Sequence, residues 1–328
     1  MTELSIERVA KRFGAATILD GISLEVGAGE VLALLGPSGS GKTTLLRIVA
    51  GFERADSGSI RLGAERIDPL PPEKRGFGMV FQHYALFPHL TVGENVAFGL
   101  ETRRVPKGEI AERVAAALAR VDLAGFEKRK VGEISGGQQQ RVAVARALAP
   151  EPRVLLLDEP LSNLDPALRE RTRRELAATL AAVGITTLLV THEQEEAFEL
   201  GARVAILNGG HLEQVAPPAE LYRAPATRFV AGFVGRASFV PVEVVEVVEV
   251  VEVGAGRARV AGELPGGELE LTAPADIESG SAAEAMFRPE QLALLPPEAA
   301  EAVAGEVVGA RFAGAVTFVR VATGGGAA

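Results

Sequence analysis

The chain has 328 residues, of which 47% are hydrophobic and 23% charged, and its net charge at pH 7 is −9. This length predicts two or three domains, and the acidic balance argues against a nucleic-acid-binding protein, which would carry a basic face. There is no cysteine, so disulfides and thiolate metal sites are excluded. The uncharged run 76–93 contains polar and turn-forming residues, so any membrane association is expected to come through a partner.

The first elements are predicted to be strands. Residues 3–9 and 18–26 alternate apolar and polar residues, as half-exposed strands do, and residues 11–14 look like a turn between them. Residues 31–35 are continuously apolar, which predicts a buried strand. The helical spacing of residues 42–50 ends at a glycine. An antiparallel start followed by a buried strand indicates a mixed sheet.

A glycine-rich loop joins the strand at 31–35 to the helix at 42–50. It matches the phosphate-binding pattern G-x-x-x-x-G-K-[ST] in the strand–loop–helix context that the pattern requires. Lys42 should reach the β- and γ-phosphates of a nucleotide, and the Thr43 hydroxyl should bind Mg²⁺. The alternative is a glycine-rich turn that binds nothing, but such a turn would not explain why a strand precedes the loop and a helix follows it. The residues expected to hold the nucleotide here are Gly36, Pro37, Ser38, Gly39, Ser40, Gly41, Lys42, Thr43 and Thr44.

Strands then alternate with helices. The pattern from 92 to 123 predicts a mostly helical insertion. This alternation indicates an α/β fold with a largely parallel core. Further strands are expected at 78–82, 154–157, 186–190 and 204–207, and further helices at about 139–148, 166–182 and 193–200.

Two consecutive carboxylates follow the apolar strand at 154–157. Asp158 would be delivered to the sheet edge beside the phosphate loop, where it can hold Mg²⁺. Glu159 can then activate the attacking water as a general base. Carboxylates that merely cap a strand are the alternative, but two in succession downstream of a phosphate loop favour chemistry.

The segment Ile134-Ser-Gly-Gly-Gln138 offers a second anion-binding site at a helix N-terminus. With the phosphate loop and the carboxylate pair, it resembles the ATP-binding cassette (ABC) ATPases, whose signature motif is this serine-glycine-glycine-glutamine stretch. The resemblance covers residues 3–233. It implies a head-to-tail homodimer in which each signature closes over ATP held by the partner copy. The signature residues are Ser135, Gly136, Gly137 and Gln138. Ile134 replaces the usual leucine, which we expect to cost no activity.

The other landmarks of the family occur in order. The resemblance implies that Phe13 stacks on adenine and that Gln82 binds Mg²⁺ and senses the γ-phosphate. It implies that residues 162–165, with Asp165, cross the dimer interface, and that His192 contacts the γ-phosphate. Without the resemblance, Phe13 would be interpreted as a core residue and His192 as a structural one.

Three segments resemble one branch of the family, the importers that use a substrate-binding protein. Residues 84–92 resemble the surface that receives a membrane subunit, although packing within the domain would also explain some of them. Residues 225–235 and 287–290 resemble the junction and core of a regulatory β-domain. This group imports sugars, polyamines, iron(III) or sulfate, with iron(III) or a polyamine slightly favoured here.

After about residue 233 the composition changes. Residues 241–253 repeat Val and Glu with a period of three, which matches neither strand nor helix, although the valines favour a strand. Short strands are expected at 257–261, 268–272, 285–287, 305–311 and 315–321. We predict a small all-β domain, truncated relative to the domain that the resemblance implies, in which one or two more strands would be expected.

The predicted fold is therefore an α/β P-loop NTPase cassette with a mixed sheet and a helical subdomain, followed by a small all-β (OB-like) domain. The expected domains are residues 1–235, with the helical subdomain at about 88–150, and residues 236–328. The expected function is that of the ATP-hydrolysing subunit of an ABC importer, which converts ATP to ADP and phosphate, with Mg²⁺ bound, at the cytoplasmic face of a membrane and so drives the membrane subunits that import a solute. The expected partners are a second copy, two permease subunits and, indirectly, an extracytoplasmic binding protein. A soluble or exporter-type ABC ATPase is the alternative.

Overall fold

The computed structural model describes residues 3–251, 255–262, 268–274, 277–292, 303–313, 316–323 and 326–327. The chain divides into two compact units, Met1–Leu221 and Tyr222–Ala328. Among the described residues, the structure contains no helix that is both long enough and apolar enough to cross a membrane.

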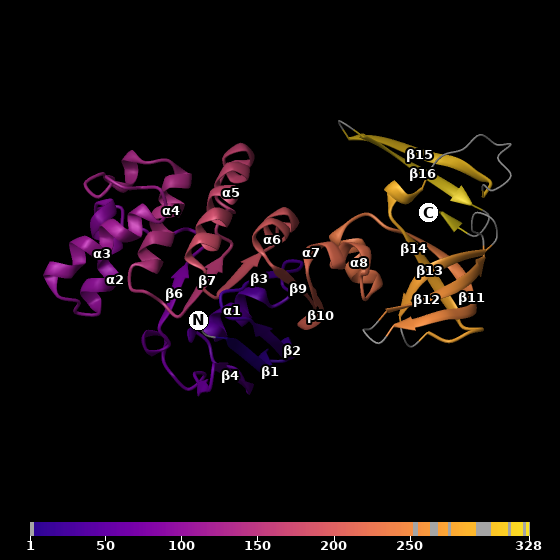
Figure 1. The fold of residues 1–328 in the computed structure, drawn as a ribbon, viewed down its shortest axis with the longest axis horizontal. Coiled ribbons are helices and arrows are strands. Elements are labelled where there is room, and N and C mark those ends of the chain that lie inside the picture. The colour runs from indigo at the N-terminus through magenta and orange to yellow at the C-terminus, as the bar shows by residue number, and fades with distance from the viewer. Residues whose placement is uncertain are drawn as a thin grey trace. The chain divides into compact units, whose positions relative to one another are not determined.

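A six-stranded mixed sheet forms the centre of the first unit (Figure 1). Five strands are parallel and β10 is antiparallel to β9, so the sheet is mixed as predicted. The antiparallel strand is β10, however, and not one of the N-terminal strands from which the mixed sheet was predicted, because those strands form a sheet of their own. The central strands are buried, which explains their continuous apolar sequences. In spatial order the strands are β10 (His211–Ala216), β9 (Arg203–Asn208), β3 (Val31–Leu35), β8 (Thr187–Thr191), β7 (Val154–Asp158) and β6 (Phe77–Val80).

A second, antiparallel sheet packs on the same core. It consists of β2 (Ala16–Val26), β1 (Leu4–Phe13), β4 (Ser57–Leu62) and β5 (Glu65–Arg66), in that order. Buried residues of both sheets and of helix α1 (Lys42–Ala50) form one hydrophobic cluster. The predicted turn at 11–14 is wrong for its first three residues, because β1 continues to Phe13, which pairs with Ala16. Register shifts in this hairpin disturb the alternation that would have revealed the strand.

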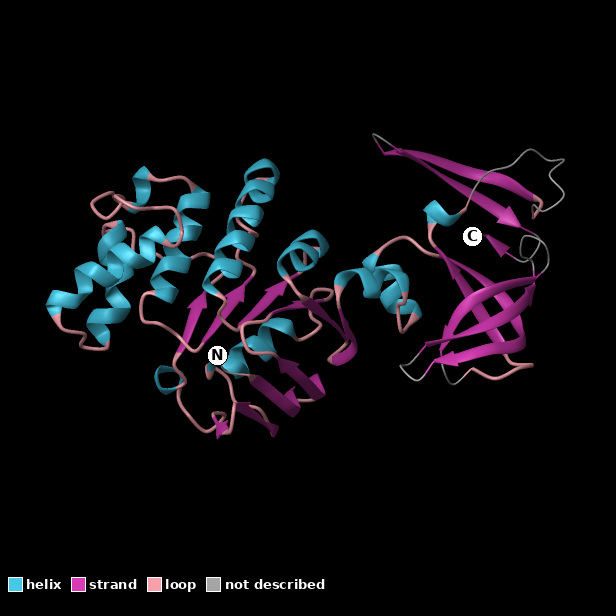
Figure 2. Ribbon diagram, viewed as in Figure 1, coloured by secondary structure: helices cyan, strands magenta, loops and turns pink. Residues whose placement is uncertain are grey.

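The helices of the first unit are arranged around the six-stranded sheet (Figure 2). The predicted helical insertion is confirmed, and α2, α3 and α4 pack on one another. Helix α4 begins at Gly136 rather than at 139, because Ser135 caps it. The helices are α2 (Val92–Thr102), α3 (Lys107–Ala119), α4 (Gly136–Leu148), α5 (Pro166–Val183), α6 (Gln194–Leu200) and α7 (Pro218–Arg223), with short 3₁₀ helices at Pro72–Lys74 and Val131–Glu133.

The second unit contains helix α8 (Arg228–Val234), and from Ser238 on its described residues form two antiparallel sheets, which confirms the β-domain expected after residue 235. One sheet has the order β13 (Glu268–Pro274), β12 (Ala255–Gly262), β11 (Ser238–Val251), β14 (Ala282–Phe287). The other has the order β15 (Gly305–Ala313), β16 (Val316–Thr323), β17 (Gly326–Ala327). A 3₁₀ helix spans Pro289–Gln291. The predicted strand start at 315 lies outside the described residues.

The Val-Glu repeat forms most of β11, and irregular pairing accommodates its period of three. The register with β12 shifts between Val244 and Glu246 and again between Val247 and Glu249. Each shift adds one residue to the two-residue alternation of a strand, so the period becomes three. Val244 is buried in the core of this sheet, and Glu246 forms an ion pair with Arg259 at 3.2 Å. Residues 252 and 253 of the repeat lie outside the described residues.

Arg288 connects the two segments of the second unit that carried the importer resemblance. Its buried guanidinium donates hydrogen bonds to the carbonyl oxygens of Tyr222, Ala231 and Arg236 at 2.8–2.9 Å. The Tyr222 hydroxyl in turn donates to Glu290 at 2.7 Å. These bonds hold residues 287–290 against helix α8.

Candidate functional site: the phosphate loop and the edge of the sheet

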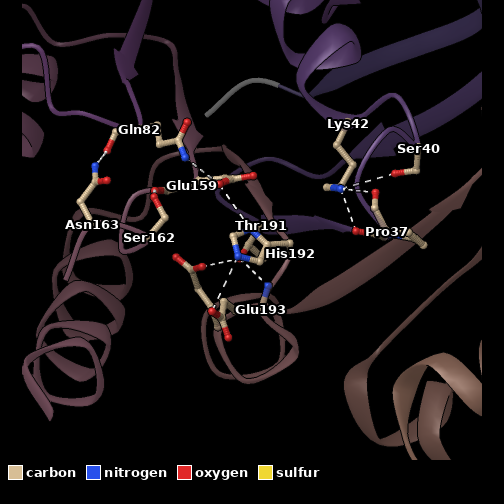
Figure 3. A network of polar contacts seen from close by, with 12 residues as sticks. Pro37, Ser40, Lys42, Gln82, Glu159, Ser162, Asn163, Thr191, His192 and Glu193 are labelled. Carbon is tan, nitrogen blue, oxygen red and sulfur yellow. Dashed lines mark hydrogen bonds and ion pairs between the residues drawn. The ribbon is translucent and has the colours of Figure 1, made fainter. Parts of the chain in front are cut away.

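The glycine-rich loop occupies residues 36–41, between β3 and α1, as predicted. The Lys42 ammonium lies inside the loop and donates to the carbonyl oxygens of Gly36 at 2.7 Å and Pro37 at 2.9 Å (Figure 3). Burial lowers the pKa of Lys42, and the charge of Glu159 opposes this shift. The ammonium group therefore lies within the loop, whose backbone N–H groups are the type of donor that binds a phosphate.

Two glycines of the loop are required by its packing. Gly41 has φ of 100°, and a Cβ there would lie 2.6 Å from Leu19 Cδ2 and 2.7 Å from the Ile18 carbonyl oxygen. At Gly36 a Cβ would lie 2.1 Å from the carbonyl oxygen of Leu207. Only glycine fits at these two positions, because the backbone passes so close to neighbouring strands.

The Glu159 carboxylate contacts two other predicted site residues, Gln82 and His192. Its Oε2 accepts a hydrogen bond from Gln82 Nε2 at 3.1 Å and lies 3.3 Å from Nδ1 of His192 (Figure 3). Its backbone has φ of 47°, a left-handed conformation that is uncommon for a side chain of this size. Its N–H still bonds to the carbonyl oxygen of Val190 at 2.9 Å. The turn thus redirects the side chain without releasing the residue from the neighbouring strand.

The order of the strands explains this gathering. Strands β6, β7 and β8 are neighbours and parallel, so their carboxyl ends meet at one edge of the sheet. Gln82 follows β6, Asp158 ends β7 and is followed by Glu159, and His192 follows β8. The phosphate loop follows β3, which lies next to β8. Residues from four distant parts of the sequence therefore reach one place.

Oxygen donors for a metal ion are present at this edge. Burial raises the pKa of Asp158, and the neighbouring Glu159 raises it further, while Arg47 opposes the shift. A carboxylate, a hydroxyl and an amide oxygen, from Asp158, Thr43 and Gln82, are ligands of the type that Mg²⁺ takes when phosphates complete its coordination. The donor set therefore fits the cation that we predicted.

The signature residues have a different environment. Ser135 caps α4, and its hydroxyl accepts from Gln138 N at 3.3 Å while Gln138 Oε1 accepts from Ser135 N at 2.9 Å. In the described part of the chain, no hydrogen bond joins Ser135, Gly136, Gly137 or Gln138 to the phosphate loop of the same copy. Asp165 is likewise a cap, at the start of α5, and accepts from Leu168 N at 3.0 Å. Within the described residues, neither the signature nor the Asp165 side chain is therefore hydrogen-bonded to the site around Glu159. Ser162, at the start of the segment 162–165, does reach this site, because its hydroxyl group donates to the carbonyl oxygen of Glu159 at 3.0 Å.

Phe13 lies at the end of β1 and is 51% exposed, which excludes the alternative of a packed core residue. The ammonium group of Lys11 lies 4.9 Å from the centre of its ring. The neighbouring Glu53 accepts a hydrogen bond from Lys11 at 2.7 Å. A half-exposed aromatic ring of this kind is accessible to a base that would stack on it.

Sequence reasoning did not single out several residues that support this edge. Asn163 donates a hydrogen bond to the Gln82 carbonyl oxygen and lies 3.1 Å from His83 Nδ1. Arg146 of α4 donates to the carbonyl oxygens of Tyr84 and Ala85, which both have positive φ. Asn163 lies within the segment Ser162-Asn-Leu-Asp165, which could have indicated it. No pattern in the sequence indicated Arg146.

The fold and the loop define a P-loop nucleotide-binding cassette. Residues 19–162 match the family model described as ABC transporter. The sulfate/thiosulfate import ATP-binding protein of Chromobacterium violaceum is 45% identical over 97% of this chain and 83% of its own length. The spermidine/putrescine import ATP-binding protein of Rubrobacter xylanophilus is 49% identical over 88% of this chain and 75% of its own length. The Fe(3+) ions import ATP-binding protein of Escherichia coli is 50% identical over 73% of this chain and 68% of its own length.

The chain therefore belongs to the ABC transporter family, in its group of importer ATPases. ATP binding and ATP hydrolysis follow from that membership.

Proposed function

We propose that two copies of this chain bind two ATP molecules between them and that hydrolysis drives two permease subunits that import a solute. The convergence of Gln82 and His192 on the Glu159 carboxylate, beside the phosphate loop, carries this proposal. A carboxylate held by two side chains near a bound γ-phosphate is placed to take a proton from the attacking water. General-base catalysis is then the role of Glu159.

The remaining residues of the edge bind and orient. Lys42 would exchange its carbonyl partners for the β- and γ-phosphate oxygens, since an ammonium group prefers charged acceptors. Thr43, Asp158 and Gln82 would hold Mg²⁺, which neutralises charge on the phosphates when it is bound. His192, at the end of β8, would contact the γ-phosphate. Phe13 would stack on the adenine.

The second copy would complete the site. Ser135, Gly136, Gly137 and Gln138 begin a helix whose first N–H groups suit an anion. They form no hydrogen bond with the phosphate loop of their own copy, and a head-to-tail dimer would place them on the partner's ATP. Asp165 and its neighbours would lie at the same interface. Dimer closure then becomes the step that couples ATP binding to movement.

A surface near Gln82 suits a permease subunit at the cytoplasmic face of the membrane. Phe81 and Phe98 are 38% and 45% exposed, and the rings of Phe87 and Phe98 lie 4.6 Å apart. Aromatic residues that remain exposed beside polar ones are typical of protein interfaces. The segment 84–92 would receive a helix of the permease, and the solute would arrive through an extracytoplasmic binding protein. We propose that residues 236–328 form the regulatory domain.

The solute is iron(III) or a polyamine in our proposal. Relatives named for Fe(3+) and for spermidine/putrescine support it, and the relative named for sulfate/thiosulfate makes sulfate the first alternative to test. Co-purification of the permease and its binding protein, followed by titration of that binding protein with Fe³⁺, spermidine, sulfate and a sugar, will identify the solute. Tight binding of sulfate alone would overturn our assignment.

Measurement of phosphate release by the purified chain, with and without Mg²⁺, tests the ATPase mechanism. We expect turnover with Mg·ATP and its loss on chelation. Coupling is tested by reconstitution with the permease, where solute uptake should require ATP. Hydrolysis that persists without any divalent cation would contradict the proposed metal site.

A further inference from the structure

One hydroxyl group, that of Thr191, forms two hydrogen bonds across the turn that carries His192; we call this pair of bonds the tie. Thr191, the last residue of β8, accepts a hydrogen bond from the backbone N–H of Glu193 at 3.0 Å. The same hydroxyl donates to Oε2 of Glu196, in helix α6. His192 lies between the two ends of this tie, and its Nδ1 is the atom that faces Glu159 (Figure 3).

Glu196 is an unusual residue to find here, since it is only 2% exposed. Its Oε1 has no hydrogen-bond partner among the described residues. Burying a carboxyl group with one oxygen unsatisfied costs free energy, and an apolar side chain would avoid that cost. A purely structural role therefore explains the residue poorly.

Three charged groups act on Glu196: Glu193 at the cap of its own helix, Glu159 just after β7, and Arg169 of α5. The pKa of Glu196 is raised to about 7, mainly because the group is buried, and the negative charges of Glu193 and Glu159 add to this rise. The hydrogen bond from Thr191 and the positive charge of Arg169 lower the pKa and so oppose the rise. The buried hydroxyl of Tyr84 also lies within its electrostatic reach. The carboxyl group thus changes its charge near neutral pH, within the electrostatic reach of the Glu159 carboxylate.

We propose that Glu196 is a positioning residue for ATP hydrolysis, which holds the Thr191 hydroxyl and thereby fixes the turn from which His192 reaches Glu159. The inference rests on the proposed function. The His192 side chain is half exposed, so packing alone does not hold it, and the backbone on either side must set its direction. A displacement of about 1 Å in such a group can reduce turnover by about 10²-fold.

The test uses the purified full-length chain and two independent ways of breaking the tie, E196L and T191V. We expect each to lower kcat by about 10- to 100-fold, with the KM for ATP changed less than about threefold. The conservative variants E196Q and T191S keep the hydrogen bond and should retain at least about a third of kcat. The exposed neighbour provides the matched control E195Q. Melting temperature and nucleotide binding show whether each variant is folded.

Two further measurements separate positioning from a structural defect. The double variant T191V/E196L should be no slower than the slower single variant, because both changes break one unit. In an H192A background E196L should cost nothing more. Because an ionised acceptor makes the stronger hydrogen bond, the ratio of wild-type to E196Q kcat should rise with pH around 7, and the ratio to E195Q should stay flat.

Full activity of both E196L and T191V would overturn the inference while leaving the proposed function intact. An equal loss caused by E196L with and without His192 would also overturn it, because it would show a general structural defect. A wild-type chain that does not hydrolyse ATP would overturn the proposed function first, and the inference with it.

Discussion

Gln82 donates a hydrogen bond from its amide nitrogen to the carboxylate of Glu159 at 3.1 Å, although the two residues are 77 positions apart. The contact exists because β6 and β7 are adjacent parallel strands and each residue lies at or just beyond the carboxyl end of its strand. A residue that senses the nucleotide would thus be joined directly to the proposed general base. Changes at Glu159 should affect hydrolysis far more than binding.

The variant E159Q keeps the size and the hydrogen-bonding capacity of the side chain but removes its basicity. We expect ATP binding to be preserved and turnover to fall by roughly 10²–10⁴-fold, the usual contribution of a general base. The variant should then accumulate as an ATP-bound dimer, visible by light scattering. E73Q, at an exposed position in a 3₁₀ helix, is the control. Near-normal hydrolysis by E159Q would remove Glu159 from its proposed role.

The buried Glu196 should make the stability of the first unit depend on pH. Its pKa is raised from 4.5 to about 7 in the folded state, so the folded chain holds a proton that the unfolded chain releases. The free energy of unfolding therefore falls as pH rises from about 4.5 to 7. E196Q removes this dependence, and its stability relative to wild type should increase by roughly 2–3 kcal/mol across that range. Denaturant unfolding at pH 5, 6, 7 and 8 measures the difference, and parallel curves would contradict the expectation.

Gly41→Ala should destabilise the chain even without nucleotide. The new Cβ would meet Leu19 and the Ile18 carbonyl oxygen in a left-handed backbone, which should cost roughly 2–4 kcal/mol. Gly39→Ala is the matched variant, because it also has positive φ but nothing within 4 Å of its Cβ. It should cost about 1 kcal/mol. Equal losses of stability in the two variants would show that steric contact does not decide the effect.

Arg75 should contribute strongly to the stability of helix α1. Its buried guanidinium donates to the carbonyl oxygens of Ile48 and Val49 near the end of that helix, both at 2.7 Å. It also bonds to the carbonyl oxygens of Leu70 and Asp68. R75A leaves these groups unsatisfied, and we expect a loss of roughly 2–4 kcal/mol in denaturant unfolding. The exposed R66A should change stability by less than about 1 kcal/mol.

The local sequence determined the phosphate loop, the apolar strands and the carboxylate pair. Their patterns are short and depend on neighbouring residues, as Gly36 to Thr43 between a strand and a helix illustrates. The Val-Glu repeat was correctly expected to be a strand. Its register shifts against β12 could not be predicted from the repeat, because they depend on which strand pairs with it. For the same reason the hairpin at Phe13 was mistaken for a turn.

The sequence by itself determined which residues could do the chemistry, because a phosphate loop, a pair of carboxylates and a signature motif are encoded in consecutive positions. Only the tertiary structure decided which of them meet. The adjacency of β6, β7 and β8 brings Gln82, Glu159 and His192 together, while Ser135 remains a helix cap that forms no hydrogen bond with the phosphate loop of its own copy. Thr191 and Glu196 are only five residues apart, but the tertiary structure decides the properties of the Glu196 carboxyl group, because α6 packs against β3 and β8 and the group is buried.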